Sequence, residues 1–300
     1  MTDRLGCAAL SRETGEDPAG TASMIRRWLL VEQPGPWGAD ALQESRLPAG
    51  LGQRIADAAS RAGARPLLIR RHGRDQAADP GPRAVFVAVS TARARWIERF
   101  AVSDPTDILD LDFRLMAEGR SVGGQPLDEP LFLVCTNGRH DPCCAELGRP
   151  LAAALAALEP EATWECSHFG GDRFAGNLVC LPHGLYYGRV TAVMAGPITQ
   201  AYRAGRVSLD HLRGRSNYPF PVQAAEIAIR RATGIDGVDD LVCEARSDHG
   251  STVHATFRDR RGARHDVEVD VTRDTRPRVL SCGAEPLPAP RYDARLVTPR

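Results

Sequence analysis

The sequence contains no lysine: all 38 of its basic residues are arginine, and 38 acidic residues balance them to a formal net charge of zero. The use of arginine alone indicates a coding bias toward GC-rich codons rather than a functional choice. A surface that binds nucleic acid needs an excess of basic residues. The balanced charge therefore argues against nucleic acid as a partner.

Long apolar segments are also absent from the sequence. The N-terminal residues have no apolar signal core, and no segment approaches the ~20 consecutive apolar residues that a membrane-spanning helix needs. We therefore expect a cytoplasmic protein with no membrane partner. Thiols stay reduced in that compartment, so clustered cysteines are expected to bind metal or to react rather than to form a disulfide framework.

Two short segments rich in turn-forming residues hold four of the eight cysteines. Residues 135–144 contain Cys135, Cys143 and Cys144, and residues 166–177 begin with Cys166 and include His168. Eight residues separate Cys135 from Cys144, and loops of this kind allow two thiolates to reach one centre. The pattern indicates a metal site or a redox site.

The remaining cysteines show no ligand spacing. We expect them to be buried, inert thiols. They are Cys7, Cys180, Cys243 and Cys282.

Hydrophobic periodicity divides the chain into three expected units. Residues 1–122 are expected to form an N-terminal α/β unit, in which residues up to about 20 are polar and loose. A segment rich in glycine and proline, residues 118–129, marks the boundary to the next unit. The expected strands of the first unit lie at 27–32, 66–70, 84–89 and 96–102, and its expected helix at 45–62.

Residues 123–207 follow the order strand, helix, strand, hairpin, helix, which is typical of a thioredoxin-like layer. We place Pro150 in the first turn of the first helix, where proline is tolerated. The expected elements lie at 131–134, 147–158, 162–165, 177–181, 185–190 and 192–204.

Residues 208–300 are expected to form a small α+β extension. A helix at 222–232 ends at Gly234, and three alternating segments at 241–245, 253–258 and 266–271 indicate a small antiparallel sheet. The residues from 286 onward are expected to be an extended tail. No internal repeat is visible in the sequence.

The two cysteine-bearing segments resemble the sucrase/ferredoxin-like family, and five further motifs extend this resemblance over most of the chain. The resemblance implies an α/β fold with a thioredoxin-like ferredoxin domain after the N-terminal α/β unit and before the small C-terminal extension. The further motifs lie at 15–21, 28–38, 173–177, 187–190 and 212–215.

The family resemblance also implies a 2Fe–2S cluster. It assigns Cys135 and Cys144 as thiolate ligands and His168 as the first histidine of a His-x-Gly-Gly-His motif. This sequence has Asp172 where the motif has its second histidine. Because replacing two thiolates on one iron by imidazoles raises the reduction potential, the charge of this site depends on its fourth ligand.

Three residues are candidates for that fourth ligand. Asp172 occupies the matching position, and a carboxylate is a workable though harder iron ligand. Cys166 is chemically the better ligand, and in an extended segment its side chain points the same way as that of His168. Cys143 ranks third, because adjacent cysteines rarely reach one centre. Cys166 and Asp172 rank close together.

The two glycines of the motif are expected to bind the cofactor. Gly170 and Gly171 would let backbone N–H groups approach a negatively charged cluster and donate hydrogen bonds to its sulfurs. Arg139, Arg173 and Arg189 either add positive potential around the cluster or are ordinary solvated residues.

The sequence favours an iron–sulfur redox protein that transfers electrons by an outer-sphere route or senses redox state, with a redox partner protein of unknown identity. Zinc is the alternative, because Cys135, Cys144, Cys166 and His168 also suit a tetrahedral structural or regulatory site. We expect His140 and His183 to be surface residues rather than ligands.

Two other activities receive less support. Thiol–disulfide exchange through Cys143 and Cys144 lacks the usual Cys-x-x-Cys arrangement. Glycoside hydrolysis needs two carboxylates set across a sugar site, and no such pair is marked in the sequence. Whether the protein is an enzyme stays open, and a non-catalytic electron carrier is the favoured interpretation.

Overall fold

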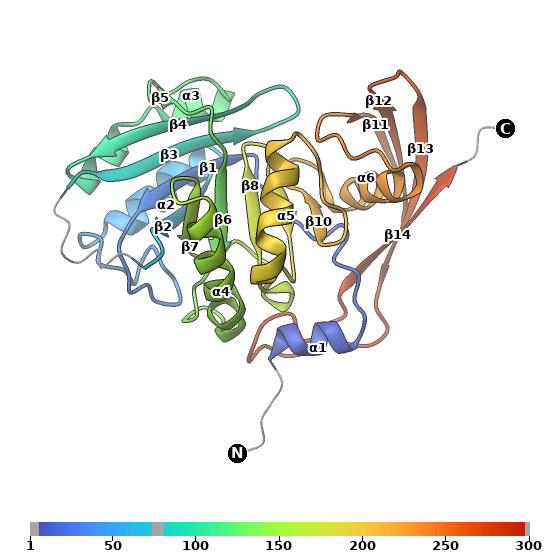
Figure 1. Ribbon diagram of the computed structural model, residues 1–300, viewed down its shortest axis with the longest axis horizontal. Coiled ribbons are helices and arrows are strands. Elements are labelled where there is room, and N and C mark those ends of the chain that lie inside the picture. Colours follow the sequence, from blue (N-terminus) through green and yellow to red (C-terminus); the bar gives the residue numbers. More distant parts are fainter. Residues whose placement is uncertain (1–5, 74–80, 298–300) are drawn as a thin grey trace, which may run out of the picture.

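Ten strands form one mixed sheet in the computed structural model, which describes residues 6–73 and 81–297. Their order is β10-β9-β8-β6-β7-β2-β1-β3-β4-β5 (Figure 1). The bounds are β1 Arg27–Glu32, β2 Arg65–Arg70, β3 Arg83–Ser90, β4 Arg95–Val102, β5 Gln125–Pro126, β6 Leu131–Cys135, β7 Thr163–Cys166, β8 Leu178–Leu181, β9 Leu185–Tyr187 and β10 Leu212–Arg215.

The two halves of this sheet repeat one topology. In the second half β6 is parallel to β7, β8 is antiparallel to β6, and β9 is antiparallel to β8, as expected for a thioredoxin-like layer. In the first half β1, β2, β3 and β4 are arranged in the same way. The halves meet where β2 pairs antiparallel with β7. The structure thus holds a repeat of topology that the sequence does not display.

The predicted boundary at residue 123 falls just before β5, which pairs with β4 of the first half of this continuous sheet. β10 lies beyond the predicted end of the second unit at residue 207, yet it pairs with β9. The domain bounds 1–122, 123–207 and 208–300 stay a prediction.

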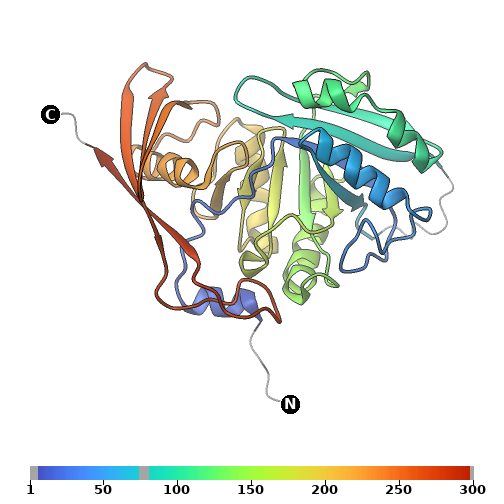
Figure 2. The same ribbon diagram turned by 180° about the vertical axis from the view of Figure 1, so that it is seen from behind.

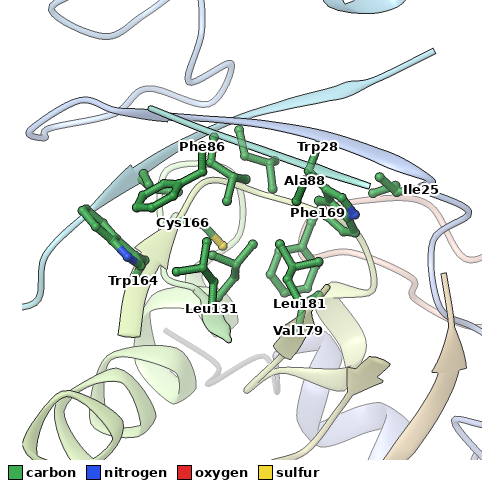
Figure 3. Close-up of a cluster of buried hydrophobic side chains, with 14 of the residues drawn as sticks. Ile25, Trp28, Phe86, Ala88, Leu131, Trp164, Cys166, Phe169, Val179 and Leu181 are labelled. Atoms are coloured by element: carbon green, nitrogen blue, oxygen red, sulfur yellow. The ribbon is translucent and has the colours of Figure 1, made fainter. Parts of the chain in front are cut away.

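Side chains alternate between the two faces of each strand. Those on one face of the sheet form an apolar core. Trp28 and Phe86 come from the first half, and Leu131 and Trp164 from the second (Figure 3). Helices cover the other face: α2 (Leu51–Arg61) and α3 (Phe113–Glu118) pack on the first half, and α4 (Pro142–Leu158) and α5 (Ala192–Arg203) on the second. These are the two layers that position the site.

The C-terminal region forms a separate antiparallel sheet of four strands, β11 (Leu241–His249), β12 (Thr252–Asp259), β13 (Arg264–Arg273) and β14 (Pro290–Val297). Helix α6 (Phe220–Thr233) packs on it and ends, as predicted, at Gly234. The expectation of an extended tail from residue 286 is wrong, because β14 pairs with β13 and packs Tyr292 and Ala294 against the same core.

The N-terminal segment is also more ordered than expected. Residues 7–13 form helix α1 (Cys7–Glu13), which buries Cys7 and Ala8 beside Cys143 and Ala175. The prediction of a loose segment is wrong for these residues, because apolar contacts with Cys143 and Ala175 keep the helix in place. Residues 1–5 of that prediction lie outside the described residues.

Helix α4 begins earlier than expected, at Pro142. The side chain of Asp141 caps it by accepting a hydrogen bond from the Cys143 N–H at 2.8 Å, and proline is favoured at the first helical position. Pro150 consequently lies inside the helix rather than in its first turn, and that prediction is wrong. Cys143 and Cys144 belong to the first turn of α4.

Short elements complete the fold. The predicted helix at 45–62 is shorter, because α2 begins at Leu51 after Gly50, which has a positive φ. Two 3-10 helices, η1 (Pro105–Asp110) and η2 (Asp172–Phe174), precede α3 and β8. Within the part of the chain that the structure describes, each helix is too short or too polar to cross a lipid bilayer.

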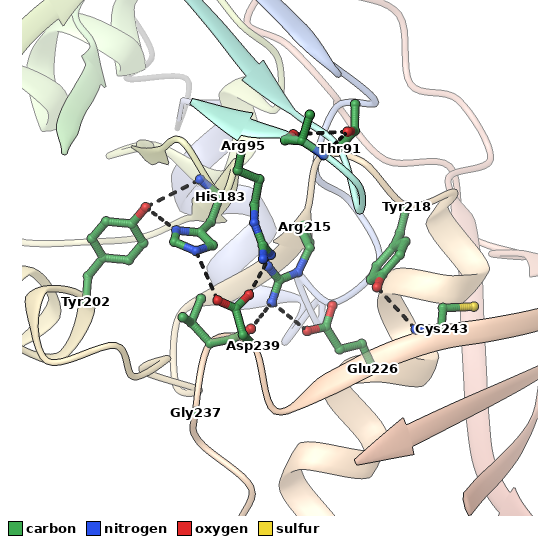
Figure 4. Close-up of polar contacts among 12 residues, drawn as sticks. Thr91, Arg95, His183, Tyr202, Arg215, Tyr218, Glu226, Gly237, Asp239 and Cys243 are labelled. Carbon is green, nitrogen blue, oxygen red and sulfur yellow. Dashed lines mark hydrogen bonds and ion pairs between the residues drawn. The ribbon is translucent and has the colours of Figure 1, made fainter. Parts of the chain in front are cut away.

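A buried ion pair between Arg215 and Glu226 fastens α6 to the large sheet (Figure 4). Glu226 of α6 lies 3.2 Å from Arg215 of β10 and 3.0 Å from Arg230, and all three side chains are at most 3% exposed. Burial raises the pKa of Glu226, but the two guanidinium groups outweigh burial and lower it. Beside this network His183, expected at the surface, is partly buried with its Nδ1 2.6 Å from the Tyr202 hydroxyl.

We predict that Glu226→Ala strongly destabilises the protein, because it leaves two buried guanidinium groups without their counter-ion. The expected loss is about 3–5 kcal/mol in the free energy of unfolding, measured by chemical denaturation. Asp248→Ala, which breaks an exposed pair with Arg246, is the control and should cost less than about 1 kcal/mol. Equal losses in the two variants would contradict this account.

Candidate metal centre

The candidate ligands meet at one edge of the large sheet. Cys135 is the last residue of β6, and His168 follows the end of β7 at Cys166. The two strands are parallel, so their carboxyl ends lie together, which is where open α/β sheets bind ligands. Cys144 enters from the first turn of α4, and Asp172 from the start of η2.

Four side chains converge there. The ligand atoms of Cys135, Cys144 and His168 all lie within 4.8 Å of one another. Asp172 Oδ1 lies 2.8 Å from His168 Nδ1 and 3.3 Å from Cys144 Sγ. The His168 Nδ1 atom is buried, and no described residue forms a hydrogen bond of good geometry with it. We call Cys135, Cys144, His168 and Asp172 the candidate metal centre.

The other two candidates for the fourth ligand lie elsewhere. Cys166 pairs in register with Cys135, and its fully buried side chain points into the apolar core (Figure 3). Within the described residues, it is not one of the ligand atoms that cluster with Cys135. Cys143 turns toward Cys282, with the two Sγ atoms 3.5 Å apart. The structure thus brings Asp172 into contact with His168 and Cys144.

His140 is a site residue that sequence reasoning missed. Its ring stacks on the ring of His168 with the centroids 3.7 Å apart, and its Nε2 lies 3.7 Å from Asp172 Oδ2. The signal in the sequence was its place in the turn between Cys135 and Cys144. Because it is more exposed than His168, it forms the solvent-facing side of the centre.

Contacts within the centre shift the pKa values of its members in different directions. A hydrogen bond with Cys144 is the main cause that lowers the pKa of Cys135 to about 6, and the same contact raises the pKa of Cys144. Burial opposes a charged His168, but its contacts with Asp172 and Cys135 raise its pKa to about 9. Burial also opposes a charged Asp172, yet contact with His168 lowers its pKa. Without a metal, one thiolate and one carboxylate therefore flank an imidazolium.

The two glycines shape the turn that joins His168 to Asp172. Gly170 and Gly171 have φ values of 105° and 87°, which residues with a side chain rarely adopt. A Cβ on Gly171 would lie 2.2 Å from the guanidinium of Arg213, a buried residue that donates a hydrogen bond to the Gly170 carbonyl. Their expected contact with a cofactor stays a prediction.

Two of the three arginines near the ligand segments hold the N-terminal segment in place. Arg173 Nε lies 2.9 Å from a carboxylate oxygen of Glu16, and Arg189 donates hydrogen bonds to the carbonyls of Glu16 and Ser11. Arg139 is exposed.

An open cleft of about 490 Å³ reaches the imidazole side of the centre. His140 and His168 lie on one wall, with Asn137 beside them, and Arg65 contributes a positive charge. The opposite side of the centre is closed, because Cys135 and Cys144 belong to the apolar core. The arrangement can hold a thiophilic metal with one side dry and the other open to solvent.

A family model described as sucrase/ferredoxin-like matches residues 18–214. The chain belongs to the sucrase/ferredoxin-like family. The match includes every member of the candidate metal centre and ends in β10, so α1, α6 and the four-stranded sheet lie outside it. No curated protein and no solved structure matches the chain.

We predict that Asp172→Asn lowers the pKa of His168 in metal-free protein from about 9 toward the ordinary value of about 6.5. The reason is that the substitution keeps the shape of the side chain but removes the charge that stabilises the imidazolium. Nuclear magnetic resonance of the histidine rings between pH 5 and pH 10 measures it. An unchanged pKa would show that Asp172 does not contact His168.

Proposed function

We propose that this protein binds a 2Fe–2S cluster at the candidate metal centre and uses it for outer-sphere electron transfer or redox sensing. The observation that supports the proposal is the convergence of two cysteines, a histidine and an aspartate at the carboxyl ends of β6 and β7. These include the residues that match the ligand motif of the family.

The donor set suits the cluster chemically. Thiolates are the preferred iron ligands of such clusters, and histidine replaces cysteine on one iron in Rieske centres. Cys144 lies in the N-terminal turn of α4, where the helix dipole favours negative charge. The buried Nδ1 of His168 lies 2.8 Å from Asp172 Oδ1, so these two donor atoms are close enough to serve one site. Asp172 supplies a fourth donor.

When bound, the cluster would supply a one-electron redox couple. The protein residues would then set its environment. The apolar core around Cys135 excludes water on one side, and the stacked rings of His140 and His168 form the contact with solvent on the other. A redox partner protein would approach through the cleft beside these rings, because the imidazole side offers the shortest route for an electron.

The proposal predicts a cluster that depends on Cys135 and Cys144. Protein purified without oxygen should be coloured, contain iron and acid-labile sulfide, and give an electron paramagnetic resonance signal after reduction by dithionite. Cys135→Ser and Cys144→Ser should abolish or strongly alter the signal. A colourless, iron-free wild-type protein would contradict the proposal.

The fourth ligand is tested by two matched variants. Asp172→Ala should change the paramagnetic signal or lose the cluster, whereas Cys166→Ala should leave the signal as in the wild type, because the Cys166 thiol is not grouped with those of Cys135 and Cys144 among the described residues. The reverse result would assign Cys166 as the ligand.

Asp172→His restores the second histidine of the family motif. We expect it to raise the reduction potential, because a neutral imidazole replaces a carboxylate and so stabilises the more negative, reduced state. A redox titration followed by electron paramagnetic resonance measures the change. A lower or unchanged potential would argue against ligation at this position.

A single zinc ion is the second candidate for this site. The ligand atoms of Cys135, Cys144 and His168 lie within 4.8 Å of one another, a spacing that suits three of the four ligands of one tetrahedral ion. Among the described residues Cys166, the fourth ligand expected from the sequence, is not grouped with them, and Asp172 lies 3.3 Å from Cys144 Sγ instead. Two irons with bridging sulfides need a wider arrangement, so the residues would have to move apart. Metal analysis separates the two: iron with sulfide supports the cluster, and zinc without sulfide that is lost in Cys135→Ser supports the zinc site.

A further inference from the structure

A second group of sulfur ligands lies beside the candidate metal centre. The ligand atoms of Cys7, Asp141, Cys143 and Cys282 all lie within 4.8 Å of one another. We call these four residues the second cluster. They come from α1, from the start of α4 and from the loop between β13 and β14, and both ribbon views show α1 beside that C-terminal loop (Figures 1 and 2).

The second cluster is closed rather than open. Cys7, Asp141 and Cys143 are at most 4% exposed, and Cys282 is only partly exposed. A Cβ on Gly6 would lie 2.6 Å from Cys143 Sγ, so the chain entering α1 packs directly on this thiol. Four ligands without an open position are typical of structural metal sites rather than catalytic ones.

Two distances in the second cluster are close to those between ligands of a tetrahedral ion. Cys143 Sγ lies 3.5 Å from Cys282 Sγ, and Cys7 Sγ lies 3.5 Å from Asp141 Oδ2. Two thiolates that each bind zinc at about 2.3 Å in tetrahedral geometry stand roughly 3.8 Å apart. A disulfide is about 2.05 Å long, so Cys143 and Cys282 are not bonded to each other.

The charge of the second cluster also lacks a counter-ion. Asp141 is fully buried, and among the described residues it forms no ion pair. Its carboxylate accepts hydrogen bonds from two backbone N–H groups, from the Ser281 hydroxyl and from the Cys7 thiol. A buried carboxylate usually pairs with a cation or binds a metal, and thiols beside it make a soft divalent cation the fitting one.

We propose that the second cluster binds one zinc ion as a structural site. Binding releases the thiol protons, and the ion then joins α1 and the Ser281–Cys282 loop to the first turn of α4. Cys143 and Cys144 are adjacent in sequence but serve different sites. Cys7 and Cys282 lie outside the residues that the family model matches, so the site depends on the two ends of this chain.

The same ion would position one contact of the candidate metal centre. Ser281 Oγ lies 3.0 Å from Asp141 Oδ2 and 2.9 Å from Asp172 Oδ2. A hydroxyl has one proton to donate, so a change at Asp141 alters the hydrogen bond that Ser281 can give to Asp172. Loss of the zinc ion is therefore expected to disturb the candidate metal centre without removing any of its ligands.

Zinc, iron and sulfide contents of the full-length protein test the proposal. Wild-type protein expressed with added zinc and purified without chelators should hold one zinc ion per chain in the second cluster. Cys7→Ser and Cys282→Ser should lose that zinc, and Cys135→Ser should retain it. Cys243→Ser, which removes a partly exposed thiol outside both groups, is the control and should retain it too.

Three results would overturn the proposal: wild-type protein without zinc, zinc retained by Cys282→Ser, or zinc lost only in Cys135→Ser. The last result would assign the metal to the candidate metal centre. Iron and sulfide measured on the same samples report on the 2Fe–2S proposal separately, so the failure of one proposal is distinguishable from the failure of the other.

X-ray absorption at the zinc edge gives a test that needs no variant. Wild-type protein should show three sulfur ligands and one oxygen ligand. A shell of two sulfurs with nitrogen would contradict the second cluster. This measurement also covers the case in which Cys7→Ser does not fold, since Cys7 is the buried first residue of α1.

Discussion

The carboxylate of Asp141 holds together the start of α4, and both sulfur-rich groups depend on it. One oxygen caps the helix at the Cys143 N–H, and the other accepts hydrogen bonds from the Cys282 N–H and the Ser281 hydroxyl. An N-terminal cap of this kind contributes about 1 kcal/mol, but here it also fixes the direction of the first turn. Because successive helical residues point about 100° apart, Cys143 and Cys144 face different sites.

The repeated topology of the sheet explains where the centre lies. Each half has a pair of parallel strands, β1 with β2 and β6 with β7. The second half has cysteines at the ends of both strands, Cys135 and Cys166, whereas the first half has Glu32 and Arg70. The same scaffold therefore carries thiols at these strand ends in one half and charged side chains in the other. Function on such a fold depends on the residues placed at its edge rather than on the fold itself.

Because the chain has no lysine, arginine is its basic residue in the buried polar contacts that support the fold. Arg213 is fully buried under the turn at Gly171 and donates hydrogen bonds to Thr21 and Asn177. Arg215 and Arg230 are buried against Glu226. The planar guanidinium offers several donors in fixed directions. Arg213 uses them to join segments that are distant in sequence, whereas Arg230 bonds within α6 and to the loop that follows it. Of these buried arginines, Arg213 supports the turn that joins His168 to Asp172.

Local sequence signals were sufficient for most of the fold. The strand at 27–32, the helix that ends at Gly234 and the order of elements from 131 to 204 follow from apolar periodicity and turn residues. The signals were less reliable where tertiary contacts decide. Residues 7–13 and 290–297 are short or polar, and they form α1 and β14 only because other segments pack against them.

For the site, the sequence by itself determined the chemistry: two segments with thiols, a histidine and two glycines, and the ligand motif with Asp172 in its last position. Only the tertiary structure decided which donors meet. It brought Asp172 and His140 to His168, turned Cys166 into the core, and joined Cys7 and Cys282 to Cys143. The physical reason is that spacing along the chain limits which residues can come close to one another. The register of β6 with β7 and the start of α4 decide where their side chains point. Cys7 and Cys282 are 275 residues apart in sequence, a separation over which no local pattern indicates contact.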